Sequence, residues 1–135
     1  MKLFSEEIRK VIDNASVSYI ATSDSDRCPH IAMEKGLKVI YDKHIGFNAW
    51  FCKKTVENLH NNPKIAIAVL DSSLKRGYQF LGKIVAIEDG AMLNGFSPEL
   101  EKNKKEIPQV ETRLKIKIDA ILDFSAGPHS DKIKD

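Results

Sequence analysis

The segment HIGFNAWFCKKTVENLHNNPKIAIAVLDS, residues 44–72, decides the fold class because its hydrophobic period changes twice. Residues 44–51 alternate in the manner of a strand, whereas KTVENLHNN, residues 54–62, has the character of a short helix. Pro63 stops that helix, since the residue before a proline is pushed out of the α region. KIAIAVLDS is apolar at nearly every position, as expected for a strand buried on both sides. The segment therefore predicts a short helix between two strands.

Strand-like alternation also predominates in the rest of the chain. Further strands are predicted at VSYIATSD (17–24), HIAMEKGLKVI (30–40), YQFLGKIVAIED (78–89) and TRLKIKIDAILDF (112–124). In the last of these, Leu114, Ile116 and Ile118 alternate with charged residues and should point inward. Six short strands without regular βαβ alternation predict a mainly β protein, built as a small barrel or a strongly curled antiparallel sheet.

Helices are predicted at two further places. Residues 3–14 form an amphipathic pattern with Ser5 as N-cap, and this helix should pack on the outside of the main body. A second helical stretch, AMLNGFSPELEKNKKE, covers residues 91–106.

Length and charge limit the class of protein. A chain of 135 residues without a long linker predicts one domain, 1–135, with an N-terminal helix in 1–15 and a polar tail in 125–135. The formal net charge is +2, and the basic clusters are interleaved with acids, so no nucleic-acid partner is expected.

Cysteine usage and the N-terminus indicate a reducing, cytoplasmic setting. Cys28 and Cys52 form no CxxC pair, which argues against a disulfide framework. Cys28 and His30 lack further ligands at useful spacing, so no metal site is expected. The start MKLFSEEIRK carries acids where a signal peptide needs an apolar run, and no apolar stretch is long enough to span a bilayer. No membrane association is therefore expected.

Lys53 and Lys54 stand directly before a helix that is expected to begin at Thr55. Cations at a helix N-terminus cost about 0.3 to 1 kcal/mol, because that end already carries about half a positive charge. A bound phosphate would offset this cost through the free backbone N–H groups, the Thr55 hydroxyl and both ammonium groups. The alternative is that the two lysines are solvated and Thr55 is an ordinary N-cap. Electrostatics alone leaves both readings open.

The order of these segments resembles the pyridoxamine 5′-phosphate oxidase-like, FMN-binding split-barrel family over about residues 8–124. The most specific piece is the pattern Lys-Thr-x-x-Asn-Leu-x-x-Asn-Pro between two strands, at residues 54–63. The next is the strand around Gly82, with an acidic-Gly turn at Asp89 and Gly90. The resemblance implies a six-stranded antiparallel split barrel with a few short helices, assembled as a homodimer with FMN at the subunit interface.

The resemblance also assigns candidate cofactor-binding residues. Those near the FMN phosphate and ribityl chain are Lys53, Lys54, Thr55, Asn48, Ala49 and Trp50. Backbone groups along the isoalloxazine ring belong to His30, Ile31, Ala32 and Met33, and the other subunit should supply Arg76, Tyr78 and Gln79. Trp50 is either a flavin-stacking residue or a buried strand aromatic at the dimer contact.

The implied function is that of an FMN-dependent oxidoreductase with NAD(P)H or another small molecule as its partner. The oxidase itself uses Arg and Lys on the second strand and a C-terminal Trp and Arg; this chain has Met33 and Glu34, then SAGPHSDKIKD. True pyridoxamine phosphate oxidase activity is therefore not expected. His30 is the one catalytic candidate, because histidine titrates close to neutral pH and either lines the flavin cleft or is hydrogen-bonded within the sheet. The alternatives are a non-catalytic FMN electron carrier, a haem-utilisation type of barrel with a histidine ligand, and an F420-binding barrel.

Overall fold

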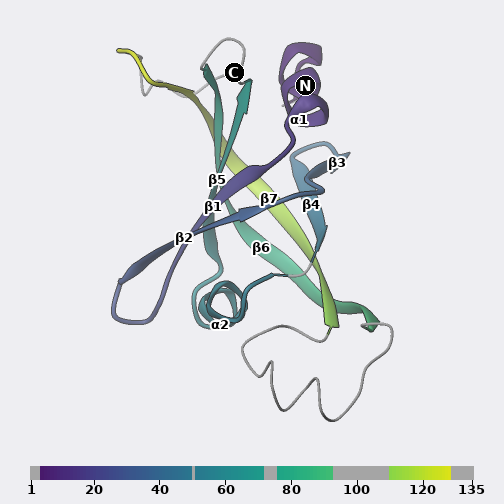
Figure 1. The fold of residues 1–135 in the computed structure, drawn as a ribbon, viewed down its shortest axis with the longest axis vertical. Coiled ribbons are helices and arrows are strands. Elements are labelled where there is room, and N and C mark those ends of the chain that lie inside the picture. The colour runs from purple at the N-terminus through teal and green to yellow at the C-terminus, as the bar shows by residue number, and fades with distance from the viewer. Residues whose placement is uncertain (1–3, 50, 72–75, 93–109, 129–135) are drawn as a thin grey trace.

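The computed structural model of the protein describes residues 4–49, 51–71, 76–92 and 110–128, and within them it shows one antiparallel sheet of seven strands. The strand order is β2-β1-β5-β6-β7-β4-β3 (Figure 1). The strands are β1 (Ser18–Ser23), β2 (Pro29–Glu34), β3 (Lys38–Tyr41), β4 (His44–Ala49), β5 (Lys64–Asp71), β6 (Arg76–Met92) and β7 (Val110–Ser125).

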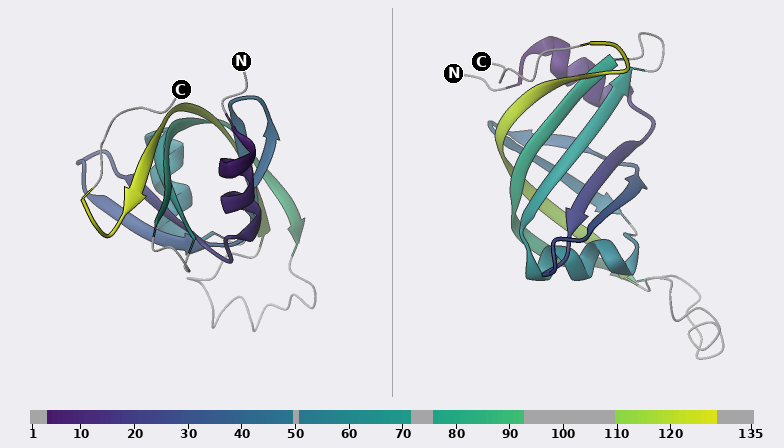
Figure 2. Two further views of the ribbon diagram at one scale, coloured as in Figure 1. Left: turned by 90° about the horizontal axis from the view of Figure 1, so that it is seen from above. Right: turned by 90° about the vertical axis from the view of Figure 1, so that its left-hand side faces the viewer.

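The sheet curls into a barrel that is not closed. β2 and β3 are its two edges, and each is hydrogen-bonded to one neighbour only. Figure 2 shows the strands curling around a central space, with the two helices at opposite ends of it. This arrangement confirms the predicted split barrel and its mainly β class.

The structure has one strand more than predicted because the stretch from His30 to Ile40 is broken. β2 ends at Glu34 and β3 begins at Lys38. Gly36 lies between them with a φ of +86°, a conformation that side chains disfavour and glycine adopts freely.

Helix α1 (Glu6–Asn14) begins as predicted, with the Ile8 N–H donating to the Ser5 hydroxyl oxygen at 3.2 Å. It does not pack on the outside, however. Ile8 and Ile12 are buried in the main hydrophobic cluster, where each contributes about 1.5 to 3 kcal/mol. The helix therefore closes one end of the barrel, beside β3 and β5.

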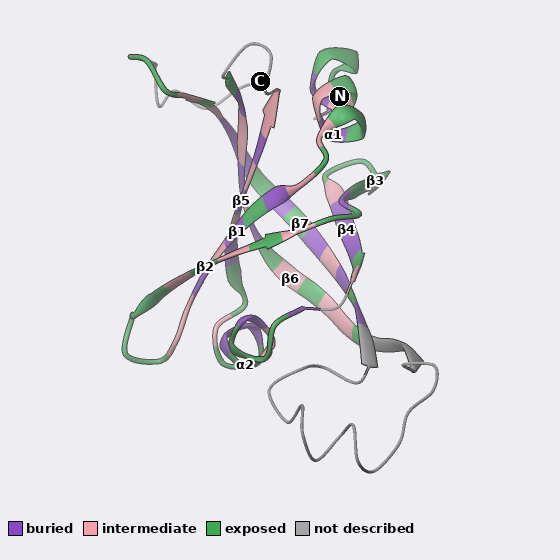
Figure 3. Ribbon diagram, viewed as in Figure 1, coloured by how far each residue is buried: buried purple, intermediate pink, exposed green. Residues whose placement is uncertain are grey.

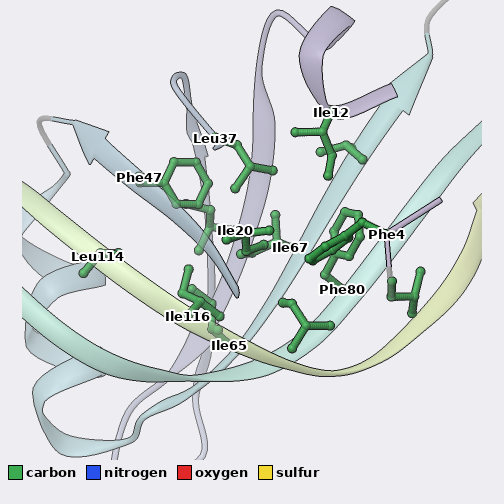
Figure 4. Close-up of a cluster of buried hydrophobic side chains, with 14 of the residues drawn as sticks. Phe4, Ile12, Ile20, Leu37, Phe47, Ile65, Ile67, Phe80, Leu114 and Ile116 are labelled. Carbon is green, nitrogen blue, oxygen red and sulfur yellow. The ribbon is translucent and has the colours of Figure 1, made fainter. Parts of the chain in front are cut away.

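The core fills the inside of the curled sheet (Figure 4). Phe4, which precedes α1, meets Phe80 of β6 with ring centroids 6.1 Å apart. On β7 the predicted alternation of buried Leu114, Ile116 and Ile118 with outward charged residues is confirmed.

β5 differs from the prediction of burial on both sides. Ile65, Ile67 and Val69 are buried, but the residues between them are only half-buried (Figure 3). The inner face packs on the core, whereas the outer face carries small alanines.

Two other predictions can be compared with the described residues. The strand β6 continues through Asp89 and Gly90 to Met92 with an irregular register, so the predicted turn at these two residues is wrong. The helical stretch predicted for 91–106 lies outside the described residues apart from its first two, which belong to β6.

Neither described helix is long and apolar enough to cross a membrane.

Candidate cofactor site

Helix α2 (Lys53–Asn61) begins two residues earlier than predicted. The N-cap is Cys52, whose extended backbone turns into the helix and whose carbonyl accepts from the Val56 N–H at 3.3 Å. Thr55 is therefore in the first turn and is fully buried, with its hydroxyl 3.0 Å from the Cys52 Sγ. The alternative reading in which Thr55 is an ordinary N-cap is wrong, because Cys52 is the N-cap and the Thr55 hydroxyl contacts a thiol inside the fold. The end of the helix was predicted correctly: Asn62, before Pro63, is extended.

The first turn of α2 has free backbone donors. The Cys52 side chain makes no capping hydrogen bond. Within the part of the chain that the structure describes, nothing accepts from the N–H groups of Lys53, Lys54 and Thr55. These are the donors that a helix leaves unpaired at its start, and together with the helix dipole they favour an anion.

The two lysine side chains of this turn are exposed. The Lys54 Nζ lies 3.7 Å from the Asp24 Oδ2, in the turn between β1 and β2. The Asp24 Oδ1 accepts from the N–H groups of Asp26 and Cys28, each at 2.9 Å. The Cys28 hydrogen bond contributes most to holding the pKa of Asp24 below its ordinary value, and Lys54 adds to it. Asp24 is thus an internal anion that partly neutralises this turn.

A buried hydrogen bond joins α2 to the β1–β2 hairpin. The Asn58 Nδ2 donates to the Thr22 hydroxyl at 3.1 Å, and both residues are almost completely buried. His30 of β2 lies directly opposite Thr22 in the sheet. The fold therefore brings the helix start, the hairpin turn and the beginning of β2 into one region, as Figure 1 shows.

β2 is an edge strand, and the isoalloxazine ring was predicted to lie along it. An antiparallel edge strand leaves about half of its backbone N–H and C=O groups without a ladder partner. Ile31 and Met33 point outward and are 72% and 62% exposed. His30 and Ala32 share the face of the buried residues of β1.

Two polar atoms of β2 are buried and have no hydrogen-bond partner among the described residues: the His30 Nδ1 and the Glu34 Oε2. The predicted alternative of a hydrogen bond within the sheet is thus not formed at the His30 Nδ1. Burial raises the pKa of Glu34, an effect that Lys35 only partly opposes. Sequence reasoning missed Asp24 as a member of the region around the start of α2, and it did not predict that a Glu34 oxygen would be buried at the far end of β2, since nothing local indicates which turn or face these residues adjoin.

The remaining predicted residues divide between two places. Asn48 and Ala49 end β4 directly before α2, and Trp50 lies outside the described residues. Arg76, Tyr78 and Gln79 begin β6, far along the strand from Lys83, which pairs with Lys64 beside the end of α2. Tyr78 packs against the core and Gln79 lies on the opposite face. Within one chain the structure does not bring these three residues to α2.

No group of three or more His, Cys, Asp or Glu side chains among the described residues could hold a metal ion.

The fold is an antiparallel split barrel, and the first turn of α2 carries two lysines and backbone N–H groups of the kind that favour an anion. The chain belongs to the pyridoxamine 5′-phosphate oxidase family, whose sequence profile matches residues 4–123. No curated protein sequence matches the chain.

Several solved structures share the fold. HupZ from Group A Streptococcus has a TM-score of 0.71 and 21% identity, covering 95% of this chain and 99% of that one. An FMN-binding protein from Syntrophomonas wolfei subsp. wolfei has a TM-score of 0.60 and 24% identity, covering 91% and 87%. HutZ, the haem storage protein from Vibrio cholerae, has a TM-score of 0.57 and 11% identity, covering 90% and 94%. At these identities the likeness shows the fold alone.

Proposed function

We propose that this protein binds FMN and acts as an FMN-dependent oxidoreductase on a small molecule, with NADH or NADPH as the first donors to test. The observation that carries the proposal is the first turn of α2, which in a member of this family holds two exposed lysines and three backbone N–H groups without an acceptor among the described residues. A phosphate dianion supplies the acceptors that this turn lacks.

Different parts of the chain would bind the phosphate and the ring of FMN. Lys53, Lys54 and the N–H groups of their turn bind the phosphate. The free backbone edge of β2 orients the ring, because an aligned row of N–H and C=O groups pairs with the polar edge of a flavin. When bound, FMN supplies the hydride or electron transfer.

His30 is the candidate proton donor of this site. Its Nδ1 is buried on the inner side of β2 and has no hydrogen-bond partner among the described residues, so it is the ring nitrogen of β2 that a bound cofactor or substrate could pair with. A His30→Ala variant that keeps FMN binding but loses NADH oxidation supports this role, whereas full turnover in that variant removes it.

We also propose that the protein is a homodimer. The outer face of β2, β1, β5 and β6 carries a continuous set of apolar side chains, which we term the apolar outer face: Tyr19, Ala21, Ile31, Met33, Ala66, Ala68 and Leu81. Large exposed apolar residues in one patch are typical of an interaction surface. A partner copy on this face is the proposed source of Arg76 and Gln79 for the FMN site.

The visible spectrum of the purified protein, alone and titrated with FMN, tests the cofactor. Flavin bands that shift on binding support the proposal. A Soret band on adding haem points instead to a haem-binding barrel, and a preference for F420 over FMN points to a deazaflavin barrel. FMN binding without NADH or NADPH oxidation favours a non-catalytic electron carrier.

Two substitutions with opposite signs test the phosphate position. Lys54→Ala should weaken FMN about tenfold and riboflavin much less, because only FMN presents the dianion. Asp24→Asn should tighten FMN, since it removes the competing carboxylate next to Lys54. Fluorescence titration of both ligands measures these changes, with Lys10→Ala on α1 as the control. Equal losses of FMN and riboflavin in Lys54→Ala would show that the phosphate binds elsewhere.

A further inference from the structure

Three lysines lie in one line across the outer surface of the sheet. Lys64 of β5 is directly opposite Lys83 of β6, and Lys83 is directly opposite Lys117 of β7. The same line continues to His44 of β4 and ends at Tyr41 of β3. All three lysines are exposed, and we term Lys64, Lys83 and Lys117 the lysine row.

Within the described part of the chain, the lysine row has no counter-charge at ion-pair distance. Among the described residues, no carboxylate forms a salt bridge with any of the three ammonium groups. Like charges directly opposite one another in a sheet are destabilising. The row contains two such pairs, Lys64–Lys83 and Lys83–Lys117. A bound anion would reduce the repulsion within both pairs and so stabilise the folded protein.

A hollow of about 500 Å³ adjoins the row. Lys64 and Lys83 line it together with Asp119, while Ala21, Ala66 and Leu81 give it an apolar side. These three apolar residues also belong to the apolar outer face, so the hollow lies at the border of the proposed subunit contact. Asp119 is the acidic residue of this hollow, and it opposes the binding of an anion there.

The lysine row is separate from the first turn of α2. Lys64 follows the C-terminal end of that helix, whereas Lys53 and Lys54 begin it. A helix of nine residues is about 13 Å long, so one small anion cannot contact both places.

We propose that the lysine row binds a linear oligophosphate, which is either a free phosphate chain or the 5′-triphosphate of a nucleotide. Neighbouring strands lie about 4.8 Å apart, so the three Cα positions span about 10 Å in a line. A chain of linked phosphates places several anionic oxygens along such a line, and each ammonium group donates to one of them. The three lysines of this site are separate from Lys53 and Lys54, which are proposed to bind the FMN phosphate.

Calorimetric titration of the full-length protein with sodium tripolyphosphate at low salt tests the proposal. Wild-type protein should bind one equivalent, and Lys83→Gln should weaken binding about tenfold. Asp119→Asn should strengthen it, and Lys10→Gln on α1 should leave it unchanged. Equal affinity for ATP and tripolyphosphate assigns the site to the phosphate chain alone, and tighter binding of ATP assigns it to a nucleotide.

Thermal unfolding gives a readout that does not require binding. Without anion at low salt, Lys83→Gln should melt at a higher temperature than wild type, because it removes two like-charge pairs. Three results would overturn the proposal: no saturable binding, loss of binding in Lys54→Ala but not in Lys83→Gln, or a change of oligomeric state in Lys83→Gln, which would make the row a subunit contact.

Discussion

Asn58 shows at the scale of one residue how α2 is held in place. It is only 1% exposed, and its amide donates to the buried Thr22 hydroxyl at 3.1 Å. Removing the amide leaves that hydroxyl buried without a partner, so Asn58→Ala should lower the free energy of unfolding by about 1 to 3 kcal/mol. Urea denaturation measures the change. Asn61→Ala, on the exposed side of the same helix, is the control, and equal effects of the two substitutions would contradict this account.

Glu34 makes stability depend on pH in the direction that its burial dictates. Because burial raises its pKa, the folded protein keeps this proton to a higher pH than the unfolded chain does. In that window the folded state binds more protons, so the free energy of unfolding falls as the pH rises above the ordinary glutamate value of about 4.3.

Glutamine carries no titrating proton, so the free energy of unfolding of Glu34→Gln should not fall in this way. The variant should therefore become progressively more stable than wild type as the pH rises above about 4.3. Denaturation at several pH values measures this difference. Glu88→Gln, an exposed glutamate on β6, should show much less change, and a constant difference between Glu34→Gln and wild type across the range would refute the prediction.

At the scale of elements, the contact of β6 with β7 depends on a glycine. A Cβ at Gly82 would collide with the Lys117 carbonyl oxygen, where the register of the two strands shifts. Gly82→Ala should therefore destabilise the fold by about 1 to 3 kcal/mol, the usual cost of overpacking. Gly127→Ala is a matched control because a Cβ there meets nothing. Similar melting temperatures for the two variants would show that the strands move apart at little cost.

The start of α2 is a second feature at the scale of elements, and it was predicted two residues too late. A threonine before a helical pattern predicts an N-cap, but here Cys52 supplies the extended backbone and Thr55 turns inward to its Sγ. Whether Cys52 or Thr55 caps the helix depends on the path of the chain after β4, and the local sequence does not specify that path.

At the scale of the whole molecule, the curled sheet uses its inside for the core and leaves the apolar outer face uncovered. If a second copy covers this face, Ile31→Glu should convert a dimer to monomers, because it buries a charge without a partner. Sedimentation velocity measures the mass. Val85→Glu, at an exposed apolar residue of β6, is the control. A wild-type protein that sediments as a monomer would refute the proposed dimer.

The sequence by itself determined the features that depend on neighbours along the chain. Ser5 begins a helix and Pro63 ends one through local backbone geometry. The alternation of Leu114, Ile116 and Ile118 selects one face of a strand, because successive side chains point to opposite sides. Together with the motif in α2, these signals were sufficient for the fold class and the family.

Only the tertiary structure decided which distant residues meet. It placed Asp24 beside Lys54 and buried the Glu34 Oε2, and among the described residues it left the first-turn N–H groups of α2 without acceptors. It also aligned Lys64, Lys83 and Lys117 in one row. These relations follow from strand order and register, which are set by packing a whole core at once; a change of one residue in register would move each side chain to the opposite face.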